Sequence, residues 1–81
     1  MVTVRYYAGA RAAAGTDSEP VLVDSAATVE QLSSELSRLH GAALSRVLPV
    51  CTFLIDETAS DQRAPLPSCA TVDVLPPFAG G

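Results

Sequence analysis

The chain has 81 residues, of which 48% are apolar and 17% are charged, and its formal net charge is −4. So short a chain predicts a single globular domain, because a second hydrophobic core would have too few residues to close. The negative charge argues against a nucleic-acid partner, which needs a basic surface, and no apolar run approaches the ~20 residues that cross a membrane.

The first elements follow from residue spacing. Apolar and more polar residues alternate over 2–7 and predict a first strand. The alanine-rich segment 8–14 predicts a short helix that ends at Gly15, a residue that tolerates positive φ. We interpret 16–19 as a polar turn and 20–23 as a second strand, with its proline at the start, where a missing donor matters least.

The clearest helix begins at Thr28, because Gln31 three residues later completes a capping-box pattern. The apolar residues that follow repeat at spacings of three and four, which predicts one buried stripe. They are Val29, Leu32, Leu36 and Leu39. Gly41, directly after His40, is typical of a helix end.

The second half alternates between apolar and polar segments. A short helical turn is expected over 42–48, and the β-branched, aromatic and aliphatic residues of 50–55 predict a buried strand. We interpret 56–68 as a surface loop anchored by Leu66, with room for one short edge strand. Alternation returns over 71–75 and predicts the last strand.

This order of elements predicts an α+β fold, a roll in which one main helix packs across a mixed sheet. The predicted domain covers 1–75, and a tail covers 76–81. The first residues do not show a basic region followed by an apolar core and a cleavage site, so a cytoplasmic location is expected.

Residues typical of an active site are scarce. His40 is the only histidine, which argues against a site built on several imidazoles, and we expect it to contact free carbonyls at the helix end. Asp56, Glu57 and Asp61 are expected to be solvated. We therefore expect this chain to have no catalytic residue of its own, no metal site and no bound cofactor.

The two cysteines lack the CxxC spacing of metal and redox sites and are too few for a disulfide scaffold. We interpret Cys51 as a core residue in a strand and Cys69 as a turn residue. A bridge between them is the less favoured alternative, because the expected compartment is reducing.

The C-terminal segment, Leu-Pro-Pro-Phe-Ala-Gly-Gly, is the most informative part of the sequence. Pro76 and Pro77 cannot extend a ladder of sheet hydrogen bonds and favour an extended geometry that points away from the domain. Residues 76–81 can span at most roughly 20 Å. Gly80 and Gly81 have no side chains, so the terminal carboxylate can enter a narrow channel. We expect the tail itself to be the functional site, and a frayed end is the alternative.

The Pro-Pro-x-x-Gly-Gly ending, the start of the chain with Arg5, Arg11 and Gly15, and the helix capped by Thr28 resemble the MoaD/ThiS family of sulfur carriers. The resemblance covers essentially the whole chain, and within the family it is greatest to small subunits of molybdopterin synthase. It implies a ubiquitin-like β-grasp fold, in agreement with the predicted elements. The chain departs from the family at 68–71, where an Asp-Gly-Asp-type turn is common, and at Asp56, where asparagine is common.

The resemblance implies a mechanism in which partners supply the catalytic groups. An ATP-dependent, ubiquitin-activating-like adenylyltransferase adenylates the terminal carboxylate, and a persulfide donor supplies sulfur to form a thiocarboxylate. Gly81 would carry this sulfur. The large subunit of molybdopterin synthase would then receive the tail and transfer the sulfur to cyclic pyranopterin monophosphate. This chain would be the non-catalytic small subunit of that sulfurtransferase complex.

The resemblance also implies the contact residues. Tyr7 and Leu75 occupy outward positions of the first and last strands, and we expect them either to form an exposed apolar patch for the partner or to pack beneath a loop. Arg11 is expected to pair with an acidic partner residue or to be solvated. The residues expected to insert with the tail are Pro76, Pro77, Phe78, Ala79 and Gly80.

Other functions remain open. A carrier for thiazole or cysteine synthesis also ends in Gly-Gly, although the two prolines favour the pterin route. A ubiquitin-like modifier would join Gly81 to lysines of other proteins. It could not form chains through its own side chains, because the five basic residues are all arginine. The last alternative is a binding module with an inert tail.

Overall fold

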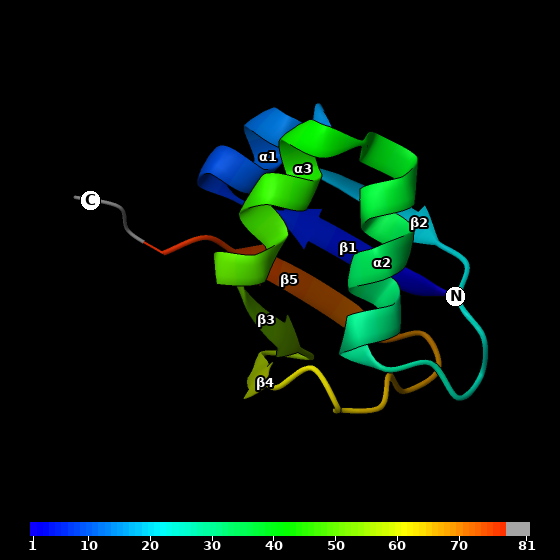
Figure 1. The fold of residues 1–81 in the computed structure, drawn as a ribbon. Coiled ribbons are helices and arrows are strands. Elements are labelled where there is room, and N and C mark those ends of the chain that lie inside the picture. Colours follow the sequence, from blue (N-terminus) through cyan, green and yellow to red (C-terminus); the bar gives the residue numbers. More distant parts are fainter. Residues whose placement is uncertain (78–81) are drawn as a thin grey trace.

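The computed structural model describes residues 1–77. They form a five-stranded mixed sheet with helices on one face (Figure 1). The elements are β1 (Val2–Tyr6), α1 (Ala8–Ala14), β2 (Ser18–Val21), α2 (Val29–His40), α3 (Ala42–Val47), the 3₁₀ turn η1 (Leu48–Val50), β3 (Thr52–Ile55), β4 (Thr58–Ser60) and β5 (Thr71–Leu75). The strand order is β2-β1-β5-β3-β4, and only β1 and β5 run parallel. The predicted α+β roll is confirmed.

The core lies between the helices and the inner face of the sheet. Its residues come from alternate positions of the strands and from one stripe of α2, as the spacing predicted. The main members are Val2, Val4, Tyr6, Val29, Leu32, Leu36, Leu44, Phe53, Ile55, Val72 and Val74, none more than 8% exposed. Leu66 closes the core from the long loop, so its predicted role as an anchor is confirmed. Within residues 1–77, no helix has the length and hydropathy that a membrane span requires.

The N-terminus of α2 is held by two sources of hydrogen-bond acceptors. The capping box is confirmed, because the Thr28 hydroxyl accepts from the Gln31 amide and the Gln31 side chain accepts from the Thr28 amide. The next two amides, of Val29 and Glu30, donate to loop carbonyls of Ala64 and Gln62 at 3.0 Å. The loop before β5 therefore satisfies helix amides that would otherwise lack partners.

The buried stripe of α2 ends differently from the prediction. Leu39 was expected in the core, but it is 46% exposed. His40 occupies the inward position instead, because the buried positions Leu32 and Leu36 are followed at the same spacing of four by residue 40. The expectation that His40 contacts helix carbonyls is also wrong, since its Nε2 lies 2.5 Å from Oε2 of Glu19 in β2.

Strand β2 covers Ser18–Val21, whereas 20–23 was expected, so Pro20 lies inside the strand. The structure tolerates this proline because β2 is an edge strand. The Tyr6 amide donates to the Asp17 carbonyl at 2.8 Å, and hydrogen-bonded pairs alternate along an antiparallel ladder. Three residues along from that hydrogen-bonded pair, Thr3 and Pro20 form a non-hydrogen-bonded pair. The nitrogen of Pro20 therefore faces away from β1, and the ladder needs no amide proton there.

Strand β3 begins at Thr52, two residues later than expected, because Leu48–Val50 forms the turn η1. Val50 is exposed. Cys51 was expected in a strand core but is half-buried just before β3, and its Sγ donates to the Val47 carbonyl at 3.2 Å. Cys69 is an exposed turn residue, as expected, and both cysteines are free thiols.

The expected edge strand within 56–68 is β4, joined to β3 by the two-residue turn Asp56-Glu57. Both turn residues have positive φ, 47° and 72°, as a type I′ hairpin turn requires. Neither is glycine, and among L-residues only asparagine and aspartate adopt this conformation readily, so the cost falls on Glu57.

This strain predicts that Glu57→Gly stabilises the protein by about 0.5–1 kcal/mol, the relief of left-handed strain minus the greater freedom of glycine in the unfolded chain. Urea unfolding followed by circular dichroism measures the effect. Glu57→Ala is the matched control, because it removes the same carboxylate and keeps the strained φ. If both variants were stabilised equally, the gain would come from loss of the Glu57 carboxylate and not from relief of backbone strain.

Candidate functional site at the root of the tail

The tail begins where the central strand β5 ends. Val74 is the register partner of Tyr6, so the next residues, Leu75 and Tyr7, lie at the same level at one end of the sheet. Tyr7 is 38% exposed and Leu75 is half-buried. The half-buried Pro76 and the exposed Pro77 follow, and the chain leaves the sheet at this end (Figure 1). The structure therefore brings together the two residues that were expected to form a patch.

The open face of the sheet, which the helices do not cover, carries a row of side chains across all five strands. From β4 to β2 the row is Ala59, Leu54, Asp73, Arg5 and Ser18. The next row toward the tail contains Thr52 and Leu75, with Tyr7 at the level of Leu75. A charged pair thus lies between small or apolar neighbours, one row from the root of the tail.

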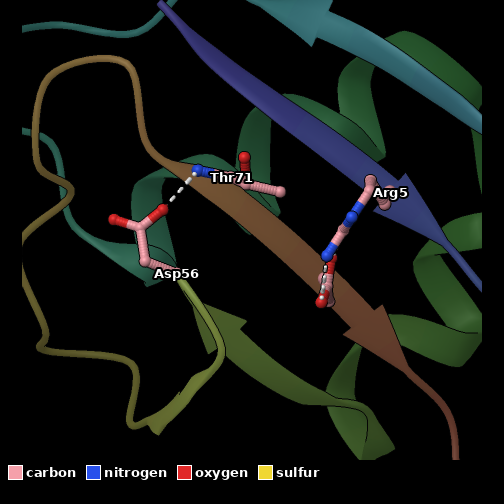
Figure 2. A network of polar contacts seen from close by, with 4 residues as sticks. Arg5, Asp56 and Thr71 are labelled. Carbon is pink, nitrogen blue, oxygen red and sulfur yellow. Dashed lines mark hydrogen bonds and ion pairs between the residues drawn. The ribbon is translucent and has the colours of Figure 1, made fainter.

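The charged pair is bidentate. Nε of Arg5 donates to Oδ1 of Asp73 at 2.6 Å, and Nη2 donates to Oδ2 at 2.9 Å (Figure 2). The Asp73 side chain is only 8% exposed, whereas that of Arg5 is 42% exposed. The hydrogen bonds to Asp73 and the charge of that carboxylate raise the pKa of Arg5 above its ordinary value. Arg5 therefore covers and neutralises a carboxylate in the middle of the sheet.

The sequence interpretation assigned no such role to Arg5 or Asp73. The residues are 68 positions apart, and each looks like an ordinary outward residue of its own strand. The signal that could have found the pair was their shared outward phase on two strands that the β-grasp order places side by side.

Two acidic loop residues, Asp56 and Asp61, are exposed, as expected, and each also accepts a hydrogen bond from the backbone. Oδ1 of Asp56 accepts from the Thr71 amide at 3.0 Å, which ties the β3–β4 turn to the start of β5 (Figure 2). Oδ1 of Asp61 accepts from the Arg63 amide at 2.9 Å. Because it binds the first amide of β5, Asp56 stabilises the entry to the strand that carries the tail.

In the turn before β5, Cys69 has a φ of 60°, in the region that favours glycine.

Arg11 projects from α1 beside this end of the sheet. Its Nη1 lies 3.3 Å from Oδ1 of Asp17, and both side chains are highly exposed, so the ion pair is readily exchanged for water or another partner. Arg5, Tyr7, Arg11 and Asp17 line one shallow depression next to the root of the tail.

A second polar cluster lies beneath the helices. The Tyr6 hydroxyl donates to Oε2 of Glu19 at 2.5 Å, and Nε2 of His40 contacts the same oxygen. The rings of Tyr6 and His40 meet edge to face, with centroids 5.8 Å apart. Burial and the hydrogen bond to Glu19 raise the pKa of Tyr6 well above its ordinary value. This cluster ties the end of α2 to the edge strand.

The residues expected to carry the chemistry lie beyond the described part of the chain. These are Phe78, Ala79, Gly80 and Gly81. Within residues 1–77 there is no group of three or more side chains that could hold a metal ion.

A mixed sheet that wraps one long helix, with the C-terminal strand in its centre, defines a ubiquitin-like β-grasp protein. SAMP1 of Haloferax volcanii, a small archaeal modifier protein, has a similar structure, with a TM-score of 0.86, 24% identity and coverage of 99% of this chain and 98% of that one. The putative molybdopterin converting factor subunit 1 of Pyrococcus furiosus gives 0.80 and 22%, with coverage of 95% and 97%. Subunit 1 in the complex of molybdopterin-converting factor subunits 1 and 2 from Helicobacter pylori gives 0.71 and 21%, with coverage of 99% and 97%.

The sequence model of the ThiS family matches residues 4–81, and the chain belongs to that family. The expected β-grasp fold and membership of the MoaD/ThiS sulfur-carrier family are thereby confirmed. No curated protein matches the chain.

The raised pKa of Tyr6 predicts a pH dependence of stability. In the unfolded chain the phenol regains its ordinary pKa of about 10, so above that pH the unfolded state binds fewer protons than the folded state. The contribution of Tyr6 to the free energy of unfolding should be fully present below about pH 10 and should be lost as the pH rises further. Urea midpoints of wild type and Tyr6→Phe, measured from about pH 8 to about pH 11, check this. The variant should lose less stability over that range, and parallel curves would contradict the prediction.

The ion pair predicts that the single variant Arg5→Met unfolds at a lower urea concentration than the double variant Arg5→Met/Asp73→Val. The single change leaves a covered carboxylate without a partner, whereas the double change replaces both charges with apolar side chains. Circular-dichroism unfolding of both proteins measures the difference. A double variant that is less stable than the single one would show that the pair is not coupled as described.

Proposed function

We propose that this chain is a sulfur carrier whose Gly81 is adenylated and then thiocarboxylated, and that it donates the sulfur to cyclic pyranopterin monophosphate in molybdopterin biosynthesis. The observation that carries the proposal is the root of the tail. The central strand β5 ends at Leu75, two prolines follow, and the sequence closes with Gly80 and Gly81. Membership of the ThiS family supports it.

The chemistry requires activation because a carboxylate is a poor electrophile and holds no sulfur until it has been converted to a thiocarboxylate. Attack of the terminal carboxylate on ATP gives an acyl adenylate and pyrophosphate, and AMP is then the leaving group. A persulfide attacks the acyl carbon, and a thiol cleaves the resulting acyl disulfide to release the thiocarboxylate. All of these reagents and catalytic groups belong to the partners, so this chain's contribution is a terminal carboxylate on an unobstructed tail.

We infer that the acceptor is a large synthase subunit and that this chain is its non-catalytic small subunit. The likeness to subunit 1 of the Helicobacter pylori complex, and to the corresponding Pyrococcus furiosus protein, supports this assignment. Tyr7 and Leu75 at the root of the tail, with Arg11 beside them, are the proposed contact residues on this chain.

A second candidate is a protein modifier, which the likeness to SAMP1 supports. In that function the activated Gly81 forms an isopeptide bond with a lysine of another protein. The chain has no lysine, so conjugates would carry single copies joined to the target, without branching through this chain's own side chains.

The carrier function is tested by the intact mass after incubation with ATP, the adenylyltransferase of the same genome and a persulfide donor. The expected result is a gain equal to the exchange of one oxygen for sulfur. A variant that lacks Gly81 is the control and should not gain mass. A wild-type chain that gains no sulfur from an enzyme proven active on a related carrier would count against the proposal.

The same product separates the two candidates. Mixed with the large subunit and cyclic pyranopterin monophosphate, a synthase subunit should return to its original mass as the pterin gains sulfur. A modifier should instead appear in lysine-linked conjugates, seen as tryptic peptides that carry its C-terminal residues.

A further inference from the structure

We propose that Arg5 determines the affinity of this chain for the adenylyltransferase that encloses its tail, by requiring a carboxylate on that enzyme's surface opposite the Arg5 guanidinium. This inference rests on the proposed function and specifies the partner's chemistry. The partner surface that fits is apolar where it meets Tyr7 and Leu75 and acidic where it meets Arg5.

The ion pair leaves Arg5 with unused hydrogen-bond donors. A guanidinium has five N–H groups, and Asp73 accepts from one on Nε and one on Nη2. Three donors therefore remain, on a side chain that is 42% exposed. Asp73 is different, because both of its oxygens are engaged and the side chain is almost covered. The pair presents donors, and few acceptors, to any surface that covers it.

The described residues offer Arg5 no further ion pair, since Asp73 is its one salt-bridge partner within 1–77. Glu57 and Asp56 line a depression with Arg5, and Glu57 acts on it only through longer-range charge attraction. On the other side lies the depression shared with Arg11, whose own contact to Asp17 is long and exposed. A carboxylate from outside can therefore reach Arg5 from the depression that Arg11 also lines.

A partner that encloses the end of the tail lies close to this row of the sheet. Asp73 is three positions before Pro76, and the tail can extend only roughly 20 Å. An entirely apolar partner surface would strip water from the three free donors without replacing it, which is unfavourable for a charged group. A partner carboxylate would restore those hydrogen bonds in the bidentate geometry that a guanidinium favours. Arg5 thus selects for an acidic partner and against an apolar one.

The test measures affinity for the purified adenylyltransferase by calorimetry at low and high salt. The double variant Arg5→Met/Asp73→Val should bind at least tenfold more weakly than wild type and should lose part of the salt dependence, because one charge contact is removed. An affinity equal to wild type at both salt concentrations would overturn the inference.

Two further variants separate recognition from folding. Glu35→Val/Arg38→Met removes an ion pair of the same kind from the exposed side of α2 and should not change the affinity. Arg5→Asp/Asp73→Arg keeps an ion pair but moves the guanidinium to the neighbouring strand. If the ion pair were only structural, the exchange would restore binding. If the partner's carboxylate meets the guanidinium at the position of Arg5, binding should stay weak.

The mass measurement on wild type keeps this inference distinct from the proposed function. A wild-type chain that binds the enzyme but gains no sulfur overturns the sulfur-carrier proposal, and the ratio of variant affinities still decides the role of Arg5. A wild-type chain that does not bind the enzyme overturns both.

Discussion

The parallel pairing of β1 with β5 is the constraint on which the rest of the structure depends. It joins the first and last strands of the domain in the middle of the sheet. One register satisfies both faces, because Val4 and Val72 are buried on the inner face while Arg5 and Asp73 pair on the outer one. A slip of one residue would turn the valines outward and carry the Asp73 carboxylate into the core. The position of the tail root is fixed by this agreement between the two faces.

Most of the fold could be predicted from the sequence, because its signals are local. Alternation identified the strands, and Thr28 with Gln31 identified the start of α2. The sequence interpretation failed where the contacts of a residue depend on a distant strand. Leu39 has the apolar character of a core residue, but the spacing of four from Leu32 and Leu36 turns His40 toward the sheet, where it meets Glu19 of β2. Periodicity specifies a face, and the strand order decides what that face meets.

The candidate site also has features that local sequence signals predict and features that depend on the arrangement of distant strands. The tail is predicted as the functional site from its prolines and glycines, whose backbone properties need no tertiary context, and its last four residues lie outside the described part of the chain. The exposed position of Tyr7 near Leu75 also followed from strand phase. The pair of Arg5 and Asp73 could not be found by phase alone, because it depends on which strands are neighbours. The domain thus fixes the position of the root of the tail, and the pair of Arg5 and Asp73 lies one row of the sheet away from it.

The two edges of the sheet have a consequence for behaviour at high concentration. An edge strand with free amides and carbonyls invites pairing with other chains and so promotes aggregation. Here one edge carries Pro20, which removes a donor, and the other is β4, which is only three residues long. Neither edge is a good template for a foreign strand. Within residues 1–77, protection of both edges leaves the sheet little means of adding a strand from another chain, so the five-stranded order ends at β2 and β4.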